Sequence, residues 1–124
     1  MPFVRLHISR EICKGSIVVD VARAINRTIA AALSVPVERV KTVVHQADAV
    51  LIGEAPATCA YLEVTCMLGR EKTVISRLSD ELHSEIRELL SPLDPKVSCS
   101  VYITESAKHL LTTDNHVALE NCPR

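Results

Sequence analysis

The same order of elements occurs twice in this chain of 124 residues. In each half, a run of β-branched and apolar residues precedes a long amphipathic segment, and a second apolar run follows it. The amphipathic segments, 14–33 and 71–90, carry apolar residues at intervals of three and four, as on one face of a helix. This repeat, at a spacing of roughly sixty residues, predicts a duplicated β-α-β architecture.

A helical crossover between the two strands of each half requires a parallel pair with a right-handed connection. Two such halves form one four-stranded sheet with both helices on one face, which is an α/β (α+β) fold. We expect a single domain, 1–124, made of two units of about 2–57 and 58–124. The expected strands are 2–8, 39–46, 59–68 and 97–104.

The expected strands carry apolar residues at consecutive positions, such as Val43-Val44 and Tyr61-Leu62. Consecutive side chains of a strand point to opposite faces, so the pattern predicts that the second face of the sheet is buried as well. With both helices on one face, no element of the chain remains to cover the other. We therefore expect partner subunits to cover it in a homo-oligomer.

Composition excludes several classes of function. The net charge is −1, so no broad basic field favours nucleic acid or an anionic membrane as a partner. The apolar stretches are too short to span a bilayer, and no signal-peptide pattern is present, so we expect a cytoplasmic protein. The five cysteines show no Cys-x-x-Cys spacing, so we predict buried thiols in a reducing compartment and no metal site.

Proline follows Met1 directly and begins the first expected strand. Methionine before a small residue such as proline is normally removed, which would leave Pro2 with a free secondary amine. Burial in an apolar pocket disfavours the charged form of an amine and lowers its pKa, and a base tuned toward neutral pH suits proton transfer. The alternative is that Pro2 only begins an edge strand, where its missing N–H costs nothing.

A processed N-terminal proline on the first strand of a duplicated β-α-β fold resembles the tautomerase superfamily. Segment 2–8 resembles the opening of 4-oxalocrotonate tautomerase, and segment 101–108 resembles that enzyme's second strand and the loop after it. Other segments are similar to 5-carboxymethyl-2-hydroxymuconate isomerase, a trimeric member of the superfamily. These segments are 25–31, 44–45 and 114–119.

The resemblance implies a homotrimeric isomerase without metal or organic cofactor, which moves a proton on a 2-hydroxy-dienoate carboxylic acid with Pro2 as the general base. Fixed cations stabilise the anionic dienolate intermediate. Arg70 matches the family's substrate-binding arginine, and Lys41 matches a second-strand arginine but lacks its bidentate geometry. His45 and Leu111 are the further candidates for substrate binding. The structural alternatives are solvated side chains for Arg70 and Lys41 and a packed ring for His45.

Two other functions stay open. Hydratase-type dehalogenases and decarboxylases of the superfamily need a carboxylate that activates water beside the proline, and Glu105, Asp48 and Glu54 are candidates. A non-catalytic oligomeric binding protein would keep the fold with an altered pocket. Two residues favour a binding protein: Lys41, and Ile12, which stands where 4-oxalocrotonate tautomerase has an arginine.

Overall fold

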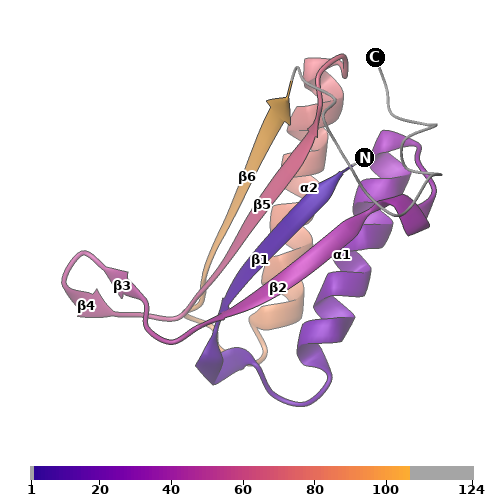
Figure 1. Ribbon diagram of the computed structural model, residues 1–124. Coiled ribbons are helices and arrows are strands. Elements are labelled where there is room, and N and C mark those ends of the chain that lie inside the picture. Colours follow the sequence, from indigo (N-terminus) through magenta and orange to yellow (C-terminus); the bar gives the residue numbers. More distant parts are fainter. Residues whose placement is uncertain (1, 107–124) are drawn as a thin grey trace.

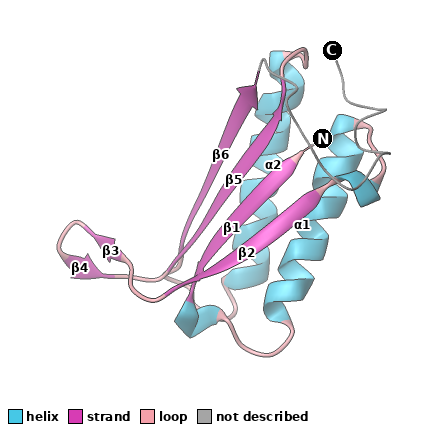
Figure 2. Ribbon diagram, in the orientation of Figure 1, coloured by secondary structure: helices cyan, strands magenta, loops and turns pink. Residues whose placement is uncertain are grey.

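The computed structural model describes residues 2–106. They form one four-stranded sheet with two long helices packed on a single face of it (Figure 1). The strands of this sheet are β1 (Phe3–Ser9), β2 (Lys41–Ala47), β5 (Cys59–Met67) and β6 (Ser98–Ser106), and the helices are α1 (Ile17–Leu33) and α2 (Lys72–Leu90). The shorter elements are the 3-10 turns η1 (Arg10–Ile12) and η2 (Val37–Arg39) and the hairpin strands β3 (Leu51–Ile52) and β4 (Ala55–Pro56) (Figure 2).

The sheet has the strand order β2-β1-β5-β6. β1 pairs with β2 in parallel, β5 pairs with β6 in parallel, and the two units meet through the antiparallel pair β1–β5. This arrangement confirms the predicted duplicated β-α-β fold, with a four-stranded sheet and both helices on one face. The long crossover in each unit is the helix, as a parallel pair requires.

The core lies between the sheet and the helices and is almost wholly aliphatic. Alternate residues of β1 and β5 point toward the helices, and the buried residues of α1 and α2 recur at intervals of four. Removing each such side chain from water stabilises the fold by about 1.5–3 kcal/mol. The fully buried residues include Val4, Leu6 and Ile8 of β1, Val21, Ile25 and Ile29 of α1, Leu62 of β5, and Leu78, Leu82 and Ile86 of α2.

Two glycines account for differences between the expected and the observed element boundaries. The first helix begins at Ile17 rather than at position 14, because Gly15 adopts a left-handed conformation (φ 59°) that helix geometry excludes. The connection 49–57 contains the hairpin β3–β4, whose turn uses Gly53 at φ 62°. The hairpin extends beyond the end of the four-stranded sheet (Figure 1).

The face of the sheet that the helices leave uncovered is more polar than the sequence predicted. Val43 and Tyr61 lie on it, as expected, but charged and imidazole side chains stand between them. The His7 ring stacks on His45 and on Tyr61, with ring centroids 5.2 and 5.7 Å apart, and His7 Nε2 lies 3.2 Å from Glu63 Oε2. A partner that covers this face must therefore accommodate polar groups as well as apolar ones.

The aliphatic core predicts how two substitutions differ in their effect on stability. Ile86→Ala removes a side chain with no exposed surface and should lower the free energy of unfolding by about 2–5 kcal/mol. The control, Val19→Ala, truncates an α1 side chain that is 50% exposed and should stay within about 0.5 kcal/mol of the parent protein. Urea unfolding at one protein concentration measures both. Equal losses in the two variants would contradict this assignment of the core.

Candidate active site

The topology brings several chain segments to one end of the sheet. β1 and β2 begin at this end, and β5 and β6 end there, because β1 and β5 are antiparallel. The backbone N–H of Lys41 donates a hydrogen bond to the carbonyl of Pro2 (3.3 Å), and that of Leu68 donates to the carbonyl of Ser106 (3.0 Å). α1 ends and α2 begins at the same end (Figure 1). Residues far apart in the sequence are thereby gathered around Pro2.

Pro2 is buried, and its neighbours across the sheet are apolar. Because Phe3 is opposite Lys41 on one side and Thr65 on the other, the positions that flank Pro2 are Val40 and Cys66. Val40 is 6% exposed and Cys66 is 2% exposed. Low-polarity surroundings of this kind disfavour a charged amine.

Val40, Pro2 and Cys66 form a row across neighbouring strands, and the carboxylate of Glu105 continues this row. Cys66 of β5 is opposite Glu105 of β6, so Pro2, Cys66 and Glu105 occupy three neighbouring strands. Burial raises the pKa of the Cys66 thiol, the Glu105 carboxylate raises it further, and Arg70 acts in the opposite direction. Cys66 is therefore a neutral thiol at physiological pH, and it lies within the electrostatic range of both charged groups.

Among the three candidate carboxylates, the structure brings only Glu105 to the Pro2 end of the sheet. Asp48 follows the opposite end of β2, where its carboxylate lies 4.0 Å from the Arg10 guanidinium. Glu54 lies in the turn between β3 and β4. Residue order alone did not separate these three carboxylates, because their distances from Pro2 depend on strand direction.

Arg70 lies in the loop between β5 and α2, at the Pro2 end of the sheet. Its Nη1 donates a hydrogen bond to the carbonyl of Leu33, the last residue of α1 (3.1 Å). A cation is favourable at the C-terminus of a helix, because the helix dipole is negative there. Nε of Arg70 is buried and has no hydrogen-bond partner within residues 2–106. The anchored guanidinium thus keeps donors for another acceptor.

Arg39, the last residue of η2, was not identified by the sequence analysis. It is partly buried, and its Nε is also shielded from solvent without a hydrogen-bond partner in the described part of the chain. Arg39 stands two residues before Lys41, at the same end of the sheet as Pro2. A single positive residue before a strand is common, so only the burial of its Nε distinguishes it.

The remaining candidates take different positions. Lys41 lies at the Pro2 end, but its register with Phe3 places it on the face that the helices leave uncovered. His45 lies four residues further along β2, about 13 Å away at the usual rise per residue, and stacks on His7. The structure therefore does not bring His45 to Pro2. Leu111 and segment 114–119 lie outside the described residues.

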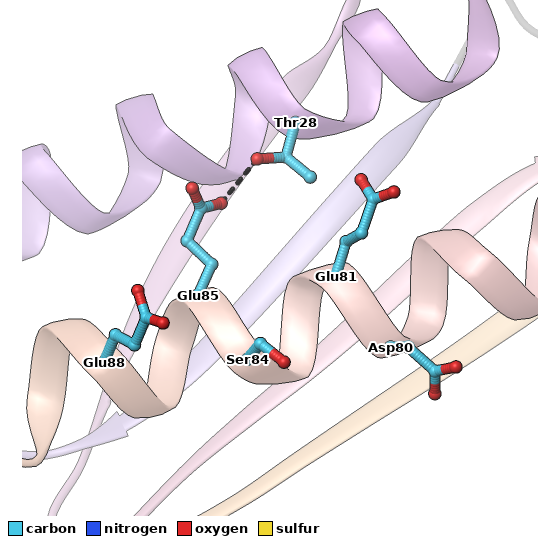
Figure 3. A pocket seen from close by; sticks show the side chains of 6 residues that line it. All are labelled: Thr28, Asp80, Glu81, Ser84, Glu85 and Glu88. Carbon is cyan, nitrogen blue, oxygen red and sulfur yellow. Dashed lines mark hydrogen bonds between the residues drawn. The ribbon is translucent and has the colours of Figure 1, made fainter.

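A groove between α1 and α2 lies on the outer side of the helices (Figure 3). Four carboxylates of α2 line it, and the Thr28 hydroxyl of α1 donates a hydrogen bond to Glu85 (2.5 Å). This negative surface repels an anionic substrate. The residues that line the groove are Thr28, Asp80, Glu81, Ser84, Glu85 and Glu88.

Residues 2–106 contain no group of three or more His, Cys, Asp or Glu side chains placed to hold a metal ion. Neither helix in this part of the chain is both long and apolar enough to cross a membrane.

Several solved structures of other proteins have the same fold as this chain. No protein-family model and no curated protein matches the sequence. A fused 4-OT symmetric trimer superposes with a TM-score of 0.77 at 17% identity, covering 98% of this chain and 99% of the other. A 5-carboxymethyl-2-hydroxymuconate isomerase from Deinococcus radiodurans R1 gives 0.78 at 13% identity, with 96% and 92% covered. A member of the cis-3-chloroacrylic acid dehalogenase family, N1, gives 0.74 at 14% identity, with 90% and 80% covered.

These solved structures are members of the tautomerase superfamily. The chain therefore has the fold of these proteins, which confirms the fold that the resemblance implied. Since proteins named for isomerisation and for dehalogenation match almost equally well, the fold by itself does not choose among these activities.

The raised pKa of Cys66 predicts a pH dependence of stability. The folded-state pKa lies above the unfolded value, which is about 8.5, so folding favours the neutral thiol. The resulting stabilisation is complete below that unfolded value and is lost as the pH rises through the folded-state pKa. Urea unfolding at several pH values between 7 and 10 should show a decline that is shallower in Cys66→Ala, by at most about 1.4 kcal/mol per pH unit.

Cys13 and Cys99 also have raised pKa values, so part of the decline should remain in Cys66→Ala. Glu105→Gln should weaken the Cys66 contribution without a cavity in the core, because Glu105 raises the pKa of that thiol. An unchanged slope in both variants would contradict the assignment.

Proposed function

We propose that this protein is a cofactor-independent isomerase that moves a proton on a 2-hydroxy-dienoate-type carboxylic acid, with Pro2 as the general base. The observation that carries the proposal is the position of Pro2. It is buried at the end of β1, between Val40 and Cys66, with the Arg70 guanidinium anchored at the same end of the sheet. A base in apolar surroundings beside a fixed cation is suited to forming and stabilising an enolate.

In this mechanism, removal of Met1 frees the Pro2 nitrogen, which is neutral before the reaction. The nitrogen takes the proton of the substrate 2-hydroxyl, and the electron pair of that O–H bond forms a delocalised dienolate. The protonated Pro2 then returns the proton to a distant carbon of the dienolate, the 2-oxo group forms, and the amine is neutral again. The cycle needs no other reactant, because each proton taken is given back.

Arg70 supplies the positive charge for this mechanism. Its Nη1 is held by the Leu33 carbonyl, so the guanidinium is fixed before substrate binds, and its buried Nε offers a donor to a substrate oxygen. α2 begins at Lys72, so the partial positive charge of its N-terminus adds to that of Arg70. Lys41 remains a second candidate cation for the substrate carboxylate.

Water addition is the second candidate function, and Glu105 is the observation that favours it. Glu105 lies in the same row as Pro2, two strands away. At the usual strand spacing, this separation is about 10 Å. Isomerisation needs a single base, which Pro2 supplies, whereas water addition also needs a carboxylate that holds a water molecule against the substrate. We therefore prefer the isomerase.

The test of the proposed function is the loss of the amine that moves the proton. Pro2→Ala should lower kcat/KM by roughly 10²- to 10⁴-fold, the usual contribution of a general base, without a change in unfolding. The assay uses 2-hydroxymuconate and its 5-carboxymethyl analogue as substrates. Pro95→Ala, at an exposed proline, is the matched control and should leave the kinetics unchanged.

Intact-mass spectrometry of the same samples tests the free amine directly. Active protein should lack Met1, so a retained Met1 would rule out Pro2 as the base. Formation of the hydrated product in place of the 2-oxo isomer would favour the water-adding alternative. Absence of both products, with tight carboxylate binding, would favour a binding protein.

We further propose that the active form is a homotrimer in which partner subunits cover the free face of the sheet. The fused 4-OT protein described above is a symmetric trimer, and this chain has the same fold. Sedimentation velocity at micromolar concentration should give three times the 13.6 kDa chain mass.

A pair of charge substitutions tests which face forms the contacts. Tyr102→Asp places a carboxylate on the uncovered face, where Tyr102 is 59% exposed, and should produce monomers. Leu93→Asp changes a residue that is 50% exposed in the loop after α2, and the trimer should persist. A monomeric parent protein, or equal dissociation of both variants, would contradict the proposed interface.

A further inference from the structure

The sheet face that points away from the helices (Figure 1) carries a row of three stacked rings. His45 of β2, His7 of β1 and Tyr61 of β5 are opposite one another in the strand register. The planes of the two imidazoles differ by 16°, and their centroids are 5.2 Å apart. His7 lies five residues after Pro2, about 16 Å away at the usual rise per residue. The rings therefore lie outside the candidate active site, and the proposed mechanism does not use them.

One of the two imidazoles has a carboxylate beside it. Nε2 of His7 lies 3.2 Å from Oε2 of Glu63, and both side chains are partly exposed. Glu63 is directly opposite Arg5 in the strand register, but the Arg5 guanidinium lies over the Phe3 ring, 5.0 Å from its centroid. Glu63 thus pairs with the imidazole rather than with the permanent cation. A proton on His7 is therefore balanced by a neighbouring negative charge.

His45 has no such ion pair in the described part of the chain. The ion pairs within residues 2–106 are His7–Glu63 and Arg10–Asp48, and the second of these lies beyond the ends of β1 and β2. A proton on His45 would stand close to a protonated His7, since the ring centroids are 5.2 Å apart. Like charges at this distance repel, so the stack holds one proton more readily than two.

The other charged groups on this face make a second proton less favourable still. Arg5 and Lys41 are cations, and Glu63 is the carboxylate among the strand positions of this face within residues 2–106. The remaining titratable groups of the face are of types that are ordinarily neutral between pH 5 and 8, namely Cys59, Tyr61 and Tyr102. Protonation of both histidines therefore adds to an existing excess of positive charge.

We propose that the His7–His45 stack makes the contact between copies of this chain sensitive to pH. A second copy covers this face while the stack holds at most one proton, and protonation of both imidazoles releases it. The inference rests on the proposed homotrimer and deepens it, because it names how that assembly is regulated. Histidine is the side chain whose charge ordinarily changes between pH 5 and 8, so the contact responds in the physiological range.

Desolvation supplies the physical reason. In the free protomer, water solvates both imidazolium charges, since His45 is exposed and His7 is partly exposed. A partner that covers the face removes this water, and an uncompensated charge is costly inside a subunit contact. Assembly therefore releases protons. The contact is strongest above the titration range of histidine, and it weakens as the pH falls through that range.

Sedimentation equilibrium at pH 7.5 and 5.5 measures this effect. Each released protomer takes up as much as one proton, so the dissociation constant of the trimer should rise by up to about tenfold per protomer for each pH unit, or about a thousandfold in all. His45→Phe keeps a ring that can stack on His7 but cannot take a proton, so this variant should stay trimeric at both pH values. His83→Gln changes an exposed histidine of α2 and should dissociate like the parent protein. If His45→Phe does not assemble at pH 7.5, His45→Gln takes its place.

Glu63→Gln should act in the opposite direction. Without the carboxylate, the first proton on the stack is already uncompensated, so dissociation should begin at a higher pH than in the parent protein. Purely structural side chains would instead weaken the trimer equally at both pH values, and that result would overturn the proposal. Circular dichroism at pH 5.5 should show a folded protomer, whereas an unfolded one would mean that acid unfolding, not the stack, causes the dissociation.

The outcomes separate this inference from the proposals on which it rests. A parent protein that is equally trimeric at both pH values would overturn the pH-sensitive contact and leave the homotrimer standing. A carboxylate of the partner, or of residues 107–124, that neutralises a protonated His45 would give this result. A monomer at both pH values would overturn both proposals. Pro2→Ala should keep the pH-dependent dissociation even if it loses all activity, because Pro2 lies far from the stack.

Discussion

The antiparallel pairing of β1 with β5 is the interaction on which the rest of the structure depends. It joins two β-α-β units that could otherwise form separate pairs of strands. Its register, from Phe3 opposite Thr65 to Ile8 opposite Ala60, buries the same face of both strands against the helices. A slip by one residue would turn Val4 and Leu6 toward the uncovered face, so burial of the core enforces the register.

This one pairing also creates the candidate site. Because the two central strands run in opposite directions, the first unit contributes the starts of its strands to the Pro2 end and the second contributes the ends of its strands. Cys66 is thereby set beside Pro2, and the β5–α2 loop is brought close enough for Arg70 to bind the end of α1. The hydrogen bond from Arg70 to Leu33 links the two units at the place where we propose that the chemistry occurs.

Periodicity in the sequence predicted the two helices and four strands, because those patterns are local. The spacing of Val21, Ile25 and Ile29 already defines the buried face of α1. The observed helix is shorter than the expected segment only at its start, next to Gly15. The two-sided apolar pattern was less informative. It predicted apolar residues on both faces of the sheet, and the register places Val43 and Tyr61 on the uncovered one. It did not predict the polar groups beside them, because the groups that meet there come from different strands.

The sequence by itself determined the duplicated fold, the place of Pro2 at the start of the first strand, and the cations available to a carboxylate. Only the tertiary structure decided which side chains share a site. It brought Glu105 rather than Asp48 or Glu54 to the Pro2 end, and it left His45 beside His7. It also shielded Nε of Arg39 from water. The physical reason is that distance and burial depend on strand direction and register, which are set by pairing between residues far apart in the chain.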